Sequence, residues 1–179
     1  MAYQFIYPRG AVIRASYICK SPEETEKLAT SLALALEAGD VLPISGDLGA
    51  GKTCFARGLA RGLGVKGEVA SPSFTYLREH APGRTDGLAF YHFDCYRLHS
   101  ADSWFELGFD EYLQHRAISL IEWPEIIAEA LPKLNFGLAL QRSEQDNMRI
   151  LEIVYSSALA EERKKKLASA LQSFSRIVR

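Results

Sequence analysis

The sequence has few cysteines and no long apolar run. Its cysteines are Cys19, Cys54 and Cys95, and an odd number without paired spacing argues against a disulfide framework or a zinc site. No apolar stretch approaches the roughly 20 residues that a membrane-spanning helix needs. The N-terminal stretch MAYQFIYPRGAVIRAS has basic residues but lacks the sustained apolar core of a signal peptide. These absences favour a cytoplasmic protein in a reducing compartment, with no membrane partner.

The chain also lacks a strong net charge. A net charge of −1 gives no overall basic field to attract nucleic acid, although a local basic patch or a protein partner could still do so. With 47% hydrophobic and 24% charged residues, the 179-residue chain has the composition of an ordinary globular domain. We predict one domain over residues 1–179, with residues 1–15 as an N-terminal extension or edge strand. We expect a monomer or weak self-association.

Hydrophobic periodicity predicts helices that alternate with strands over the first two thirds of the chain. Ser21 and Glu24 form a capping box that starts a helix, and Gly39 ends it. Further helices are expected over residues 52–64, 100–115 (with an irregularity at Gly108) and 160–174. Strands are expected over residues 40–44, 68–80 (interrupted by a Ser-Pro turn), 88–98, 117–123, 134–142 and 148–157, the last two as a hairpin. This pattern is typical of a layered α/β fold.

The stretch LPISGDLGAGKTCF, residues 42–55, carries the clearest motif. It matches G-x-x-x-x-G-K-[ST], with a strand before it and a helix after it, as a phosphate-binding loop requires. Glycines let the backbone N–H groups point at phosphate oxygens, and the helix start adds its positive dipole end. Lys52 is expected to reach the β- and γ-phosphates, and Thr53 to offer its hydroxyl to Mg²⁺. The predicted phosphate-binding residues are Gly46, Asp47, Leu48, Gly49, Ala50, Gly51, Lys52 and Thr53.

The rest of the chain narrows the class of nucleotide protein. The N/T-K-x-D stretch with which GTPases read guanine is absent, which favours ATP. No arginine cluster suggests the lid of a small-molecule kinase, and a large ATP motor would need more chain. A small-molecule kinase and a nucleotide-binding scaffold that never hydrolyses stay open as alternatives to an ATPase.

Two acids at predicted strand ends suggest hydrolysis. Glu122 ends the buried stretch ISLIE, and Asp94 lies in YHFDCYR, where His92, Asp94 and Tyr96 alternate onto one face. In P-loop proteins an acid at the end of a strand beside the loop supports Mg²⁺ or the attacking water. Asp94 is predicted to hold Mg²⁺, directly or through water, or to orient a water. The alternative for both acids is an ordinary solvated strand end.

Several motifs occur together in the order GDLGAGKT, SPSFTY, YHFDCYRL, ELGFDEYL and IEWPE. In this order and spacing they resemble the TsaE (YjeE) family, over about residues 17–158. The phosphate loop alone is shared by many families, whereas the HFD-x-YRL and EWP stretches after SPSF are far more specific. The resemblance implies a P-loop NTPase-like α/β fold with three layers and a mixed, mostly parallel sheet that ends in an antiparallel hairpin.

The resemblance also implies an activity and partners. Family members are small Mg²⁺-dependent ATPases required for N6-threonylcarbamoyladenosine (t6A) synthesis in tRNA, so ATP and Mg²⁺ are the implied cofactors. The implied partners are TsaD, which transfers the threonylcarbamoyl group, and TsaB, the dimer partner of TsaD. The chain would meet tRNA only indirectly, through that complex. Its ATP hydrolysis would reset the complex between turnovers, and it would not transfer the threonylcarbamoyl group itself.

Roles for single residues follow from the same resemblance. Asp94 matches the catalytic-site acid, Glu122 the Mg²⁺-associated acid, and Trp123 a residue beside the nucleotide. The implied metal site comprises Thr53, Glu122 and Asp94. For Trp123, packing in the core stays open as the alternative.

Two further stretches match the family pattern. Residues 71–74 match a switch-like segment near the γ-phosphate, although many relatives have Thr where this chain has Ser73. His92, Tyr96 and Arg97 belong to the strand motif and are expected to contact a partner or support the active site. No arginine finger is evident, so slow hydrolysis by the isolated chain is expected. The expected mechanism is a switch, in which the γ-phosphate orders residues 71–76.

Overall fold

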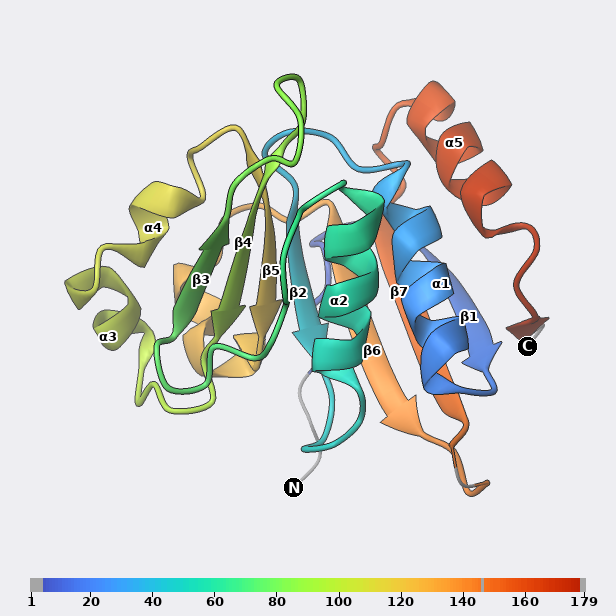
Figure 1. Ribbon diagram of the computed structural model, residues 1–179, viewed down its shortest axis with the longest axis horizontal. Helices are drawn as coiled ribbons and strands as arrows, with labels where there is room; N and C mark the ends of the chain where they lie inside the picture. The colour runs from blue at the N-terminus through green and yellow to red at the C-terminus, as the bar shows by residue number, and fades with distance from the viewer. Residues whose placement is uncertain (1–4, 146, 178–179) are drawn as a thin grey trace.

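The computed structural model describes residues 5–145 and 147–177. They form one mixed sheet in the order β3-β4-β5-β2-β6-β7-β1-β8, with helices on its two faces (Figure 1). The strands are β1 Val12–Cys19, β2 Val41–Ser45, β3 Leu77–His80, β4 Ala89–Asp94, β5 Ala117–Glu122, β6 Phe136–Arg142, β7 Arg149–Ser156 and β8 Arg176–Ile177. The helices are α1 Pro22–Ala33, α2 Lys52–Gly62, α3 Ala101–Glu106, α4 Phe109–Tyr112, the 3₁₀ helix η1 Pro124–Ala130, and α5 Glu161–Leu171.

The centre of the sheet is parallel and its flanks are antiparallel. Strands β4, β5, β2 and β6 pair in parallel, and β3 adds to β4 in the opposite direction. On the other side β6 and β7 form an antiparallel hairpin, and β1 continues the sheet beside β7. The predicted mixed sheet with a parallel core and a C-terminal hairpin is confirmed.

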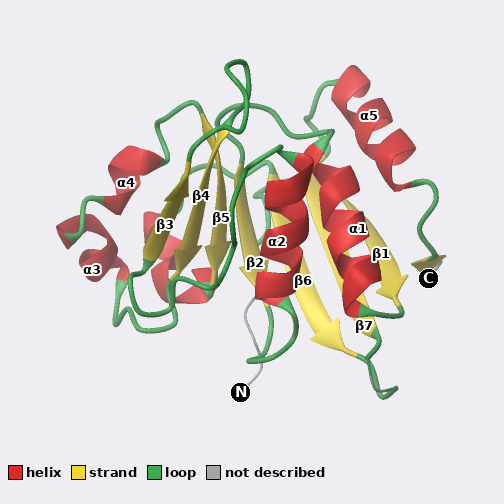
Figure 2. Cartoon of the chain, in the orientation of Figure 1, coloured by secondary structure: helices red, strands yellow, loops and turns green. Residues whose placement is uncertain are grey.

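Both faces of the central strands are buried, which produces the three layers. Along β5, Ile118 and Leu120 join the core cluster under α1 and α2, whereas Ile121 points to the cluster that includes residues of α3 and η1. Figure 2 shows α1 and α2 side by side over the same part of the sheet. A strand that is apolar on both sides is expected where helices cover both faces of a parallel sheet.

Three predicted elements are clearly shorter than expected. The predicted strand 88–98 is β4, which ends at Asp94. Helix α1 ends at Ala33 rather than near Gly39, and the chain then turns where the Asp40 carboxylate accepts the Glu37 N–H at 2.8 Å. Of residues 68–80, only β3 is a strand. The backbone N–H groups of Thr75 and Tyr76 both donate to the Pro72 carbonyl, at 2.9 and 2.7 Å. This local turn uses donors that a strand ladder would need, so the second predicted strand begins only at Leu77. The first predicted strand, before the Ser-Pro turn, does not form.

Two other boundaries follow the sequence more closely. The predicted irregularity at Gly108 is a real break, since Gly108 has a φ of 70° and separates α3 from α4. Residues 12–15, within the predicted extension, form the first half of β1 and pair with β7.

Candidate nucleotide-binding site

The C-terminal ends of three neighbouring parallel strands define the site. Ser45 ends β2, Glu122 ends β5 and Asp94 ends β4, and in the register of the sheet Glu122 lies beside both Ile44 and Asp94. Ligands of open α/β sheets bind outside the carboxyl ends of the strands. The three strand ends therefore meet at the edge where such a fold places its ligand.

Residues 46–53, which we call the phosphate loop, connect β2 to α2. Gly46, Gly49 and Gly51 have φ angles of 151°, 73° and 109°, which favour glycine. A Cβ on Gly46 would overlap the Leu140 carbonyl oxygen of β6, so the loop also needs glycine for close packing against the sheet. The loop geometry expected from the motif is present.

Lys52 is buried at the start of α2. Its Nζ donates to the carbonyl oxygens of Gly46 and Asp47, at 2.6 and 3.0 Å, and lies 3.9 Å from the centroid of the Trp123 indole ring. Burial lowers the pKa of Lys52, against the opposing attraction of nearby carboxylates, chiefly Glu122 and Asp94. A buried ammonium group at the start of a helix can bind a polyphosphate, since the helix N-terminus also favours negative charge.

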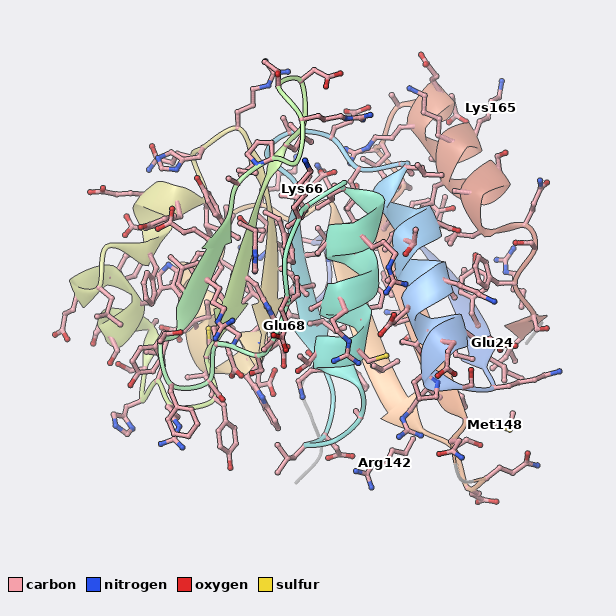
Figure 3. All side chains as sticks on the ribbon, in the orientation of Figure 1. Glu24, Lys66, Glu68, Arg142, Met148 and Lys165 are labelled. Atoms are coloured by element: carbon pink, nitrogen blue, oxygen red, sulfur yellow. The ribbon has the colours of Figure 1, made fainter. Side chains whose placement is uncertain are left out.

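Two arginines from the β6–β7 hairpin hold the outside of the phosphate loop. Arg142 donates to the carbonyl oxygens of Leu48 and Gly49, both at 3.3 Å, and Arg149 donates to the Ala50 carbonyl at 2.8 Å. Figure 3 shows Arg142 at the end of the sheet where the loop before α2 lies. Neither arginine is recognisable from the sequence alone, because their contacts depend on β6 pairing with β2.

Glu122 connects the strand ends to the phosphate loop. Its Oε1 lies 2.9 Å from His92 Nε2 and 3.4 Å from Thr53 Oγ1, and both His92 and Glu122 are buried. His92 Nδ1 has no hydrogen-bond partner among the described residues. Nε2 is thus the ring nitrogen that contacts the carboxylate, and this contact fixes the orientation of the Glu122 side chain.

Asp94 contacts residues 71–76, which we call the facing segment because they lie across the cavity from the phosphate loop. Ser71 Oγ donates to Asp94 Oδ2 at 2.6 Å, and the Tyr96 N–H donates to Oδ1 at 3.1 Å. The Asp94 N–H in turn donates to the Tyr76 carbonyl at 2.9 Å. The predicted polar face is thus only partly right: His92 and Asp94 lie in β4 and make specific contacts, whereas Tyr96 lies beyond the end of the strand, in an exposed turn.

Trp123 satisfies both interpretations that the sequence left open. It is 9% exposed and belongs to the core cluster with Ile121 and Ile127, yet its ring lies against Lys52 and, at 4.9 Å between centroids, against Tyr96. Its φ of 58° is unusual for a non-glycine residue. This backbone turn directs the indole toward the phosphate loop immediately after Glu122.

A cavity of about 500 Å³ lies between these groups. It is lined by most of the predicted site residues, namely Leu48, Gly49, Gly51, Lys52, Thr53, Asp94, Glu122 and Trp123, together with Ser71, Ser73, Phe74, Tyr96 and Arg97. Of the other predicted residues, Ala50 is fully buried and Gly46 and Asp47 line a separate hollow behind the loop. The volume suits a small-molecule ligand.

The donor set is compatible with Mg²⁺ that shares its ligands with phosphate. Thr53 Oγ1 and Glu122 Oε1 are oxygen donors 3.4 Å apart, and Mg²⁺ commonly takes few protein ligands together with phosphate oxygens and water. Within residues 5–145 and 147–177, no group of three or more His, Cys, Asp or Glu side chains is arranged to hold a metal alone. Thr53 and Glu122 would therefore share the metal with phosphate oxygens and water.

Comparisons with known proteins decide the family. A family model described as "Threonylcarbamoyl adenosine biosynthesis protein TsaE" matches residues 19–151. The chain belongs to the TsaE family. Its members are named for the biosynthesis of threonylcarbamoyladenosine in tRNA, so a role in this tRNA modification is the function that the family assigns.

Individual TsaE relatives cover most of the chain. The Bacillus subtilis TsaE is 41% identical over 130 residues, which cover 73% of this chain and 79% of the relative. The Treponema pallidum TsaE is 38% identical over 133 residues, covering 74% of this chain and 96% of the relative. A crystal structure of B. subtilis YdiB superposes with a TM-score of 0.73 at 34% identity, over 89% of this chain and 97% of that one. The α/β fold is therefore shared with a solved protein.

No helix in the described part of the chain is both long and apolar enough to span a membrane. This agrees with the short apolar runs of the sequence.

Proposed function

We propose that this TsaE-family chain is a slow Mg²⁺-dependent ATPase of the cytoplasm that serves t6A synthesis by acting on the TsaD–TsaB complex. The observation that carries the proposal is the convergence of the phosphate loop, Lys52, Thr53, Glu122 and Asp94 on one cavity. A phosphate loop alone would bind a nucleotide, whereas two buried acids at adjacent strand ends add what hydrolysis needs.

Each side chain of the site has a separate role in ATP hydrolysis. Lys52 turns from the Gly46 and Asp47 carbonyls to the β- and γ-phosphates and neutralises their charge. Thr53 and Glu122 hold Mg²⁺, which supplies charge stabilisation of the phosphoryl group. Asp94 orients the attacking water, whose oxygen bonds to the γ-phosphorus as the bond to the bridging oxygen breaks. The products are ADP and inorganic phosphate, and the proton that the water loses passes to solvent.

The facing segment couples this reaction to the partners. It reaches the site through the bond between Ser71 and Asp94, so a change at the γ-phosphate alters the segment's anchoring. Order and disorder of a segment driven by a γ-phosphate is an established form of switch. Hydrolysis then changes the surface that the chain offers to TsaD and TsaB and resets that complex between turnovers.

Reconstitution tests the proposal. Purified chain with ATP and Mg²⁺ should hydrolyse ATP far more slowly than a typical enzyme rate of about 10 s⁻¹, and a chelator should abolish the activity. With TsaD and TsaB, threonylcarbamoyl-adenylate and tRNA, multiple turnovers of t6A formation should require both this chain and hydrolysable ATP. Multiple turnover with a non-hydrolysable analogue would contradict the resetting role and favour a nucleotide-binding scaffold.

A further inference from the structure

Arg97 is a cation in the cavity that the reaction above leaves unused. It lies in the loop between β4 and α3 and lines the cavity together with Lys52, Glu122 and Asp94. Lys52 and Arg97 are the basic side chains among the lining residues. Since a triphosphate and two carboxylates bring an excess of negative charge into this space, a second cation there can act on the phosphates.

The backbone around Arg97 is held while its side chain is free to turn. The Tyr96 N–H donates to Asp94 Oδ1 at 3.1 Å, and the Leu98 N–H donates to the Cys95 carbonyl at 2.9 Å. These two bonds fix the residues on both sides of Arg97. Within the described residues no carboxylate lies within ion-pair distance of its guanidinium group, which stacks instead on the Phe74 ring, with Cζ 4.5 Å from the centroid.

The other arginines near the cavity already have hydrogen-bond partners. Arg142 and Arg149 donate to backbone carbonyls on the outside of the phosphate loop. Arg97 differs because its partner is a ring that is itself 81% exposed, and a cation–π contact is weak at such a site. A hydrogen bond from guanidinium to phosphate is considerably stronger, and the planar fork of arginine can make two in parallel.

We propose that Arg97 is the arginine that stabilises the transition state of γ-phosphoryl transfer, supplied by this chain itself. The guanidinium leaves Phe74 and donates to the γ-phosphoryl oxygens as negative charge builds on them and on the leaving oxygen of ADP. Because Phe74 belongs to the facing segment, the movement also removes a contact that holds this segment. The inference rests on the proposed ATPase function and adds the residue that completes its site.

Three variants test it: Arg97→Ala, Arg97→Lys, and Arg116→Ala as the matched control. Arg116 is an exposed arginine that directly precedes β5, at the end of the strand opposite to Glu122. The first readout is single-turnover hydrolysis of saturating Mg²⁺–ATP, alone and with TsaD–TsaB. The second is calorimetric affinity for ADP with and without aluminium fluoride, which mimics the phosphoryl group in the transition state.

Arg97→Ala should slow hydrolysis by about 100-fold or more, since arginine fingers contribute about 10³–10⁵ in rate. Its affinity for ADP alone should stay within about threefold, while the tightening by aluminium fluoride is lost. Arg97→Lys should recover part of the rate because it keeps the charge but not the fork. Arg116→Ala should match the wild type in both readouts.

The outcomes separate this inference from the proposed function. A wild-type chain that hydrolyses no ATP, alone or with its partners, overturns both. An active wild type with Arg97→Ala within about threefold of it, and with the fluoride effect intact, overturns the role of Arg97 alone. Loss of partner stimulation with an unchanged basal rate would make Arg97 a partner contact and likewise overturn its catalytic role.

Discussion

The two walls of the cavity differ in how they are held. The phosphate loop packs through Gly46 against β6, and Arg142 and Arg149 bind its carbonyl groups from outside. The facing segment is joined to the strand ends chiefly by the bond from Ser71 to Asp94 and the bond from the Asp94 N–H to Tyr76. Its Phe74 ring is 81% exposed.

This difference suggests a division of labour. A loop whose carbonyls are already bound keeps its N–H groups aimed at phosphate and needs little rearrangement to bind a nucleotide. A segment with few buried contacts can open or close at a small cost in free energy. We therefore expect the phosphate loop to respond alike to ADP and ATP, and the facing segment to respond to the γ-phosphate.

Removal of Lys52, the cation of the phosphate loop, should have the largest effect on nucleotide binding. Lys52→Ala should weaken ATP affinity about 10- to 150-fold, because a hydrogen bond to a charged group contributes about 1.5–3 kcal/mol. Isothermal titration calorimetry measures this directly. Lys66→Ala is the control, since Lys66 lies at the other end of α2 (Figure 3). Unchanged affinity in Lys52→Ala would remove Lys52 from its assigned role.

The acids between the two walls should affect the rate more than the binding. Glu122→Gln and Asp94→Asn should each lower the hydrolysis rate about 100-fold or more, a typical contribution for a positioned catalytic group. Affinity for ATP should change by less than about tenfold. Steady-state kinetics beside calorimetry separates the two effects, with the exposed Glu68→Gln as control. Full ATPase activity in both variants would refute the two-acid site.

A pair of variants can compare the walls directly. Arg149→Ala should weaken ADP and ATP affinity alike, by about fivefold, because one hydrogen bond that orients the loop is worth about 1 kcal/mol. Ser71→Ala should leave ADP affinity unchanged and lower affinity only for the triphosphate. If Arg149→Ala changed the affinities for ADP and ATP differently and Ser71→Ala did not, the phosphate loop rather than the facing segment would be the part that responds to the γ-phosphate.

The smallest effect concerns Glu125, whose carboxylate accepts a hydrogen bond from Ser45 at 3.5 Å. Burial raises the pKa of Glu125, although Lys52 acts to lower it. Because the folded pKa lies above the unfolded one, the group favours the folded state when protonated, and this contribution is lost as pH rises through the folded pKa. The Tm of Glu125→Gln minus the Tm of the wild type should therefore increase as pH rises, and it should reach at most about 2 °C at neutral pH. Melting curves in which the gain shrinks with rising pH would contradict this.

Much of the site could be predicted because its residues follow strand ends. The phosphate loop motif, Asp94 and Glu122 are each encoded locally, and parallel pairing brings them to one edge of the sheet. Arg142 and Arg149 could not be predicted this way, since they reach the loop only after β6 lies beside β2. The late start of β3 has a local cause, the turn closed on the Pro72 carbonyl, which hydrophobic alternation does not reveal.

The central claim is that the phosphate loop is fixed while the facing segment responds to the γ-phosphate. Its most direct test is hydrogen–deuterium exchange with Mg²⁺ and either ADP or a non-hydrolysable ATP analogue. Peptides that cover residues 46–53 should gain similar protection with both nucleotides. Peptides that cover residues 71–76 should gain protection only with the triphosphate analogue. Equal protection of residues 71–76 by ADP and by the analogue, or none with either, would contradict the proposal that this segment reports the γ-phosphate.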